Sequence, residues 1–328
     1  MSPLRSLTDA LAWLGRHGTS TMPLMAVIGI ALPVLGTLLK PFVALAVFLL
    51  LVLAFLRVDV AALRDHAKRP MTVVAIAIWT MLILPAGLCW SYRLFGIDVR
   101  SPDLMLALVL QAATSPMMSS PAIAAMLGLD AALVLLGMVV CTALVSFSAP
   151  LFVRLFVGEV MSISPVALGL KLSAMLLGSA LTALIVRRLA GRARIAHYAE
   201  HFDGLSVILM FVFIAAVTGG VGAVLLANPG LALGLAALAF VLTLLLSGST
   251  MIVFARLGRP QAAALGLMAS QRNMGLMLGA AGAVLPDLVW LYLALAQLPI
   301  YTLPQLMKPV LRRYLRPNTH DQSRLAKN

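Results

Sequence analysis

The amino-acid sequence predicts an all-α polytopic membrane protein with ten transmembrane helices, arranged as two inverted five-helix repeats whose fourth and ninth helices are broken and cross. Three observations support this prediction. Hydrophobic residues make up 62% of the 328 residues and charged residues 11%, a composition that a soluble domain with a polar surface does not reach. Apolar runs of membrane-spanning length succeed one another along the chain, and two of them contain a polar interruption.

The expected spans are apolar runs of about 17 to 25 residues, bounded by Pro, Gly and charge clusters. They cover residues 21–38, 41–57, 71–93, 102–128, 130–157, 163–186, 204–227, 230–256, 260–284 and 287–311. The first repeat therefore occupies 21–157 and the second 163–311, followed by a basic tail at 312–328. In residues 1–20, leucines recur at helical spacing beside charged residues. This segment is either an amphipathic helix on the membrane surface or an extension of the first span.

The distribution of Lys and Arg predicts the orientation. Eighteen of the 24 lie in residues 1–20, in the connections after the second, sixth and eighth spans, and near the C-terminus, whereas the opposite side has four. The positive-inside rule then places both termini in the cytoplasm, with the chain in the cell (inner) membrane. The formal charge of +13 is explained by these short loops, so we expect lipid and not nucleic acid as the environment. Lys171 and Arg272 are the two cations left inside predicted spans.

The two polar interruptions predict a binding site. The fourth span contains 114–121, in which two prolines among Ser and Thr should open the helix. The ninth span contains 270–275, with Arg272 at its centre. Matching interruptions in inverted halves are typical of a transporter site at the bilayer midplane, where helix N-termini favour an anion. The predicted substrate-binding residues are Thr114, Ser115, Met118, Ser119, Ser120, Ser270, Gln271, Arg272, Asn273 and Gln297, and the predicted helix-breaking residues are Pro116, Pro121 and Gly275.

Arg272 and Lys171 each have two interpretations. An arginine at this depth costs several kcal/mol unless it faces a polar cavity or an anion, so it indicates a functional site. Alternatively, Arg272 braces the crossing helices and does not touch substrate. Lys171 is a second candidate for a functional cation, or its side chain extends toward the membrane surface. Ser and Thr in spans also often serve helix packing.

At the two interruptions the chain resembles the bile acid:sodium symporter superfamily. The resemblance implies a panel domain of spans 1, 2, 6 and 7, a core domain of spans 3–5 and 8–10, and sodium-coupled transport of organic anions such as bile acids and small carboxylates. By this resemblance, Ser120 matches a ligand of the first sodium site. Asn273 matches an amide that faces substrate, and Gln297 lies near a tenth-span amide.

The chain departs from that family at the sodium ligands. Pro121 stands in place of an Asn ligand, Met268 in place of an acidic one and Arg272 in place of a Gln. Val134 and Met138 stand near the fifth-span hydroxyl ligands. Because hard cations need oxygen ligands, the sequence predicts a sodium-independent carrier of a small organic anion, in which Arg272 replaces the bound cation.

Other functions remain as alternatives at this stage. One is an ordinary sodium:organic anion symporter with altered ligands, and another is a transporter-like ligand sensor without turnover. An enzyme is not expected, because every His, Asp and Glu falls in a loop or near a span end and none could act as a base at depth. The same distribution argues against proton coupling. We expect no cofactor, no metal site and no obligate protein partner.

Overall fold

The computed structural model describes residues 13, 28–29, 31–57, 70–158 and 164–315. Within these ranges the protein is helical and has no β-strand. Outside the described residues lie 1–12 and 14–20 of the predicted N-terminal segment, 21–27 and 30 of the predicted first span, and 316–328 of the basic tail.

The described part of the first half of the chain includes ten helical elements, several of them parts of one span. They are α2 (Pro33–Leu39), η1 (Lys40–Phe42), α3 (Val43–Arg57), α5 (Pro70–Ile78), η2 (Trp79–Ile83), α6 (Leu84–Leu94), α7 (Ile97–Arg100), α8 (Pro102–Ala113), α9 (Ser120–Met126) and α10 (Ala131–Phe156). The second half forms α11 (Pro165–Ala190), α12 (Arg192–His197), α13 (Ala199–Thr218), α14 (Val221–Ala227), α15 (Pro229–Val253), η3 (Ala255–Leu257), α16 (Arg259–Ser270), α17 (Met274–Ala281), η4 (Gly282–Val284), α18 (Asp287–Leu295) and α19 (Gln297–Tyr314).

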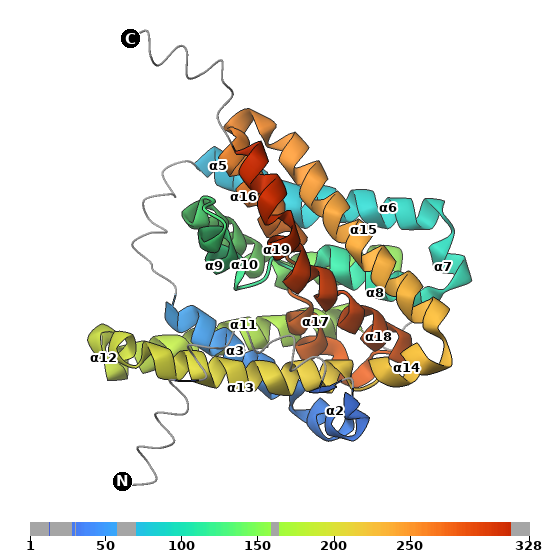
Figure 1. Cartoon of the computed structure of the whole chain (residues 1–328), viewed down its shortest axis with the longest axis horizontal. Helices are drawn as coiled ribbons and strands as arrows, with labels where there is room; N and C mark the ends of the chain where they lie inside the picture. Colours follow the sequence, from blue (N-terminus) through green and yellow to red (C-terminus); the bar gives the residue numbers. More distant parts are fainter. Residues whose placement is uncertain (1–12, 14–27, 30, 58–69, 159–163, 316–328) are drawn as a thin grey trace.

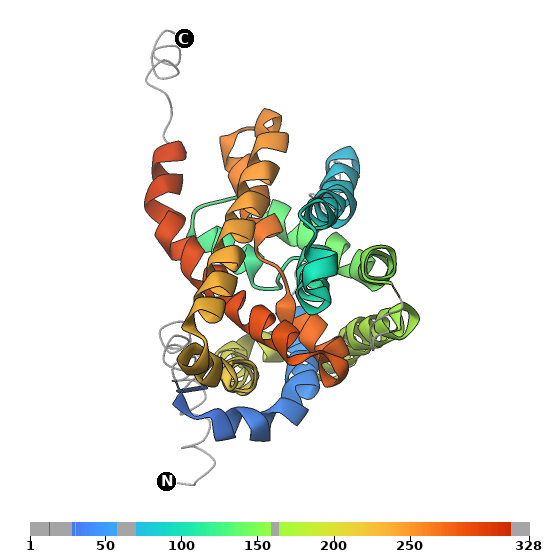
Figure 2. The same cartoon turned by 90° about the vertical axis from the view of Figure 1, so that its right-hand side faces the viewer.

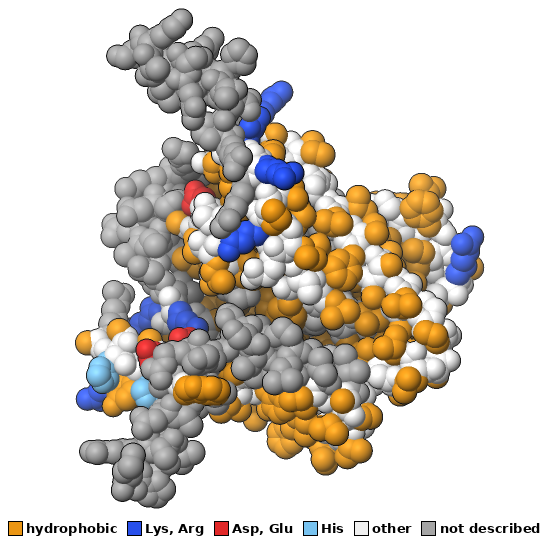
Figure 3. All heavy atoms as spheres, in the orientation of Figure 1, with side chains coloured by type: hydrophobic (Ala, Val, Ile, Leu, Met, Phe, Trp, Pro, Cys, Tyr) orange, Lys and Arg blue, Asp and Glu red, His pale blue; other side chains and the backbone are white. Residues whose placement is uncertain are grey.

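Among the described residues, six helical stretches are long and apolar enough to cross a membrane. They are Pro33–Arg57, Met71–Leu94, Ala131–Phe156, Pro165–Ala190, Ala199–Ala227 and Pro229–Val253. The protein is therefore compatible with a membrane location. Figure 3 agrees, because hydrophobic side chains cover much of the face that it shows, whereas Lys and Arg appear mainly toward the left and upper parts of the view, with one group at the right edge.

Several predicted span boundaries need correction. The seventh span begins at Ala199 and not at 204. The chain does not form a loop between residues 38 and 41: the helical path continues through η1, because Pro41 lies in the first turn of that element, where a proline fits. The sixth span ends at Ala190 and not at 186, since the helix continues until Gly191 adopts φ 78°. Arg187 and Arg188 lie in this last turn, where positive charge stabilises a helix C-terminus.

The helices pack in two groups around the middle of the molecule. In one group α3 packs against both α11 and α13, and α13 packs against α2. In the other, α15 packs on α16, and α10 contacts α8, α9 and α16. Helix α10 also packs against α11, and α17 packs against α3 and α11, so these two helices join the groups. Figure 1 shows α3, α11 and α13 together to the left of α17 and below it, with α5, α6, α15 and α16 above.

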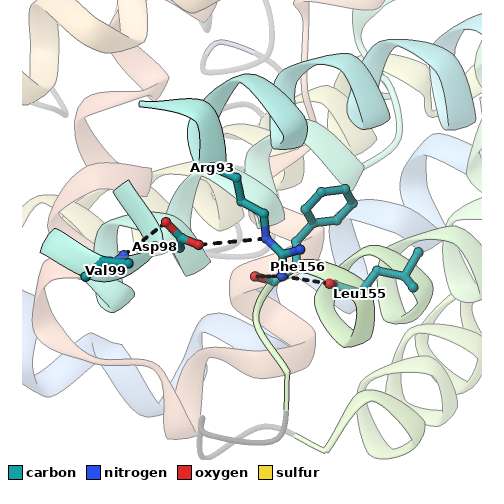
Figure 4. Close-up of polar contacts among 5 residues, drawn as sticks. All are labelled: Arg93, Asp98, Val99, Leu155 and Phe156. Atoms are coloured by element: carbon teal, nitrogen blue, oxygen red, sulfur yellow. Dashed lines mark hydrogen bonds and ion pairs between the residues drawn. The ribbon is translucent and has the colours of Figure 1, made fainter. Parts of the chain in front are cut away.

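Arginine side chains satisfy backbone carbonyls at two helix ends. Arg93 Nη2 donates to the carbonyl oxygens of Leu155 (3.0 Å) and Phe156 (3.5 Å) at the end of α10. The guanidinium also lies 5.1 Å from the centre of the Phe156 ring and 3.9 Å from a carboxylate oxygen of Asp98 (Figure 4). Arg187 Nη2 donates in the same way to a carbonyl near the end of α3, the Leu56 oxygen, at 2.7 Å. Each guanidinium therefore donates hydrogen bonds to backbone carbonyl oxygens that have no partner at a helix C-terminus.

Candidate functional site

The first break separates α8 from α9. Helix α8 ends at Ala113, and Thr114 has an extended backbone with φ −73° and ψ 157°. Pro116 lies within the non-helical segment 114–119, as the sequence predicts. Pro121 does not: it occupies the first turn of α9, where the missing N–H group removes no hydrogen bond. It therefore starts the helix that follows the break.

The second break is shorter and separates α16 from α17. Helix α16 ends at Ser270, and Gln271, Arg272 and Asn273 leave the helix. The Asn273 side chain caps α17, because its Oδ1 accepts a hydrogen bond from the Leu276 N–H at 3.1 Å. Gly275 is the second residue of α17 and so lies just beyond the break.

The two breaks pair with each other through their backbones. Met117 N–H donates to the Gln271 oxygen at 2.6 Å, and Asn273 N–H donates to the Ser115 oxygen at 2.8 Å, which pairs Pro116 with Arg272 in antiparallel fashion. Figure 2 shows both non-helical segments in the interior, with helices around them. Unwound backbone inside a membrane protein needs such internal partners, since lipid offers none.

The Arg272 guanidinium completes this crossover. The residue is 1% exposed. Its Nη1 donates to the Thr114 oxygen at 2.7 Å, and Nη1 and Nη2 lie 3.4 and 3.5 Å from the Thr80 oxygen. Among the residues that the structure describes, the ion pairs are Arg57 with Asp203 and Arg93 with Asp98, and no carboxylate pairs with Arg272.

Thr80 presents a free carbonyl because its helix is locally widened. It lies in η2, a π-helical turn in which the Leu84 N–H bonds to the Trp79 oxygen, five residues back. The same spacing would assign the Thr80 oxygen to residue 85, which is a proline without an N–H group. The sequence reasoning did not identify Thr80. Pro85 within the span 71–93 was the signal that could have pointed to it.

A cavity of about 430 Å³ lies beside the crossover. Its walls come from α3, α9, α10, α13, α17 and α19 together with both breaks. Seven of the predicted site residues line it: Met118, Ser119, Pro121, Arg272, Asn273, Gly275 and Gln297. Most of its other walls are apolar, including the side chains of Val47, Leu50, Met138 and Met210.

The remaining predicted site residues do not line this cavity. Ser270 and Gln271 face a much smaller space of about 40 Å³ between α15, α16 and α19. Thr114, Ser115, Pro116 and Ser120 are buried in the crossover and line neither space. Lys171 is exposed on α11 and also lines neither. The structure thus divides the predicted site into a cavity-lining part and a buried structural part.

The position of Met268 is apolar. Met268 is fully buried in one cluster with Ile76 and Val134. A Cβ added to Gly137 would lie only 2.7 Å from the Met268 sulfur. The thioether therefore fills the space that the absent glycine side chain leaves, and it packs among carbon atoms.

Comparisons with known proteins add no family assignment. No family model matches the chain, and no curated protein matches it. The function is therefore inferred from the crossover and its cavity.

Proposed function

We propose that this protein is a secondary transporter of a small organic anion that works by alternating access. In this proposal the chain is a divergent member of the bile acid:sodium symporter superfamily, with ten spans in two inverted repeats and both termini in the cytoplasm of the inner membrane. The observation that carries the proposal is Arg272, a buried cation without a carboxylate partner among the described residues, which lines a cavity where two broken helices cross.

The cavity supports a ligand of small-molecule size. Its volume of about 430 Å³ lies in the range of about 300 to 1,000 Å³ that ligand pockets occupy. Its walls are mainly apolar, and Ser119, Asn273 and Gln297 supply polar groups close to Arg272. A cation in a medium of effective dielectric about 20 attracts an anion 4 Å away by roughly 4 kcal/mol. An organic anion fits this combination better than a neutral or cationic ligand.

The arrangement of the helices supports alternating access. The cavity lies between α3 and α13 on one side and the crossover, α10 and α19 on the other. Transporters with broken helices operate by rocking one bundle against another around such a site. In the proposal, α2, α3, α11 and α13 form the panel domain, and the remaining spans form the core domain that carries the crossover.

The proposal includes independence from sodium. The guanidinium of Arg272 donates to the oxygens of Thr114 and Thr80, and these are the kind of acceptors that a sodium ion would need. A sodium ion about 4 Å from the guanidinium would also be repelled by roughly 4 kcal/mol. The buried side chain of Met268 contains a sulfur and no oxygen that could bind sodium. Arg272 thus replaces the bound cation as a covalently attached charge.

Uptake into proteoliposomes tests the transporter proposal. Wild-type protein, Asn273→Asp and Asn273→Ser would be compared with a set of radiolabelled small carboxylates. Asp and Ser both preserve the cap of α17, but only Asp brings negative charge into the cavity. We expect Asn273→Ser to retain uptake and Asn273→Asp to lose it, with both proteins monodisperse. Equal uptake by the two variants would show that charge at the crossover does not contribute to anion transport. Binding by the wild type without any flux would identify a sensor.

A further inference from the structure

A second arginine lines the same cavity. Arg57 is the last residue of α3, and its side chain is 48% exposed. The cavity-lining residues of α3 are Val47, Leu50, Leu51, Ala54 and Arg57, which recur at intervals of one helical face. At a rise of about 1.5 Å per residue, Arg57 lies roughly 15 Å along α3 from Val47.

The two ends of this wall differ in chemistry. Val47 lies against α17: a Cβ added to Gly279 would meet its side chain at 3.2 Å. Arg57 marks the other end, and only apolar side chains of α3 line the cavity between them. The cavity therefore offers polar groups at the crossover, an apolar wall along α3, and a cation where α3 ends.

Arg57 is held by groups that a ligand can replace. Its Nη2 lies 2.5 Å from Oδ1 of Asp203, whose side chain is 44% exposed. The same nitrogen donates to Ser206 Oγ at 3.3 Å, while the Ser206 hydroxyl donates to the Phe202 oxygen at 2.8 Å. Ser206 thereby positions the Arg57 guanidinium on the cavity wall. Asp203 forms an ion pair with this guanidinium, and because the pair is solvated it contributes little to stability.

Arg272 is less able to bind a ligand directly. It is 1% exposed, and its Nη1 and Nη2 donate to two backbone carbonyls that would otherwise be buried without a partner, whereas its Nε has no partner among the described residues. Moving this guanidinium to a ligand would leave both carbonyls unpaired. Arg57 can exchange one carboxylate for another without such a loss.

We propose that Arg57 is the residue that recognises the charge of the substrate. The anionic group of the substrate displaces Asp203 and takes the forked donors of Arg57, while its apolar part lies along α3. Asp203 acts as a competitor for the same guanidinium. This inference rests on the proposed function, because it assigns a role within the same cavity.

Matched pairs of anionic and neutral probes test this assignment. The probes are benzoate, phenylacetate and hexanoate, each with its primary amide, and dissociation constants come from thermal denaturation of the purified full-length chain in detergent. We expect Arg57→Gln to weaken binding of the carboxylates about tenfold or more and to leave the amides unchanged. Arg57→Lys keeps the charge and should retain part of the affinity. Asp203→Asn should tighten carboxylate binding several-fold because the competitor is gone.

Arg256→Gln is the matched control, since Arg256 is exposed and does not line the cavity. Carboxylate affinity that stays at the wild-type value in Arg57→Gln would overturn the assignment and leave the proposed function intact. An equal loss for carboxylates and amides would also overturn it, because that result indicates a change of cavity shape. If no carboxylate binds to the wild type, the proposed function fails and the role of Arg57 fails with it.

Discussion

Arg93 and Arg272 perform the same chemistry in two different environments. Each directs its guanidinium to backbone carbonyls that lack a partner within their own helix. Arg93 does so at the end of α10, with a side chain that is 39% exposed and Asp98 nearby (Figure 4). Arg272 does so inside the crossover at 1% exposure, with no carboxylate paired to it among the described residues.

The difference shows what a helix break at depth requires. The carbonyls at a helix end can bind water or a partly solvated cation, which contributes about 0.3 to 1 kcal/mol. A buried carbonyl that loses its partner costs about 1 to 3 kcal/mol, and Arg272 serves two of them. The charge of Arg272 is therefore retained in the interior because the unwound backbone needs its donors.

The largest expected effect comes from removing each arginine in turn. Arg272→Gln should lower the free energy of unfolding by about 2 to 4 kcal/mol and abolish anion uptake, because a shorter amide cannot reach both carbonyls. Arg93→Gln should cost about 1 kcal/mol or less and preserve uptake. Denaturant unfolding in detergent and proteoliposome uptake measure the two quantities. Similar losses in both variants would remove the distinction between the two sites.

A smaller effect is expected from restoring the missing N–H group in the third span. Pro85→Ala supplies a donor near the Thr80 oxygen, or allows the π-helical turn to return to α-helical bonding, so Arg272 loses an acceptor. We expect uptake to fall several-fold with stability unchanged or higher. Pro102→Ala is the control, because Pro102 begins α8 and blocks no hydrogen bond. Wild-type uptake in Pro85→Ala would show that the Thr80 contact is dispensable.

The sequence predicted the breaks well and their internal contacts poorly. Pro116 and the polar residues around Arg272 were sufficient to locate both non-helical segments, since proline and buried polar groups act locally. Pro121 and Gly275 were assigned to the breaks but lie in the helices that follow them. A sequence pattern does not fix which residue of a break is the first to recover helical dihedrals.

The division of the site could not be predicted. Thr80 reaches Arg272 from another span, and that contact depends on how three helices cross. Gln271 and Asn273 are two residues apart, yet they line different spaces, because side-chain direction in an unwound segment follows no helical period. The apolar packing of Met268 against Gly137 likewise depends on the contact between α16 and α10.

The proposed topology places Arg93 near the outer membrane surface, and labelling can test this placement. Arg100 lies in α7, close in sequence to Arg93, and Arg194 lies in α12; both side chains are exposed. In a background where the buried Cys89 and Cys141 are replaced by Ala, we expect a membrane-impermeant maleimide to label Arg100→Cys from outside. Arg194→Cys should be labelled from the cytoplasmic side alone. Labelling of both from one side would rule out the proposed topology.

The sodium requirement of transport tests the central claim most directly, because the claim is that Arg272 replaces a bound cation. Uptake of a transported carboxylate would be measured in sodium and in choline buffers of equal ionic strength, for the wild type and for the double variant Met268→Glu with Arg272→Gln. We predict equal wild-type uptake in the two buffers, and a partial sodium dependence in the double variant, which supplies a carboxylate ligand and removes the fixed charge. A steep requirement for sodium in the wild type would contradict this account and indicate an ordinary sodium-coupled symporter.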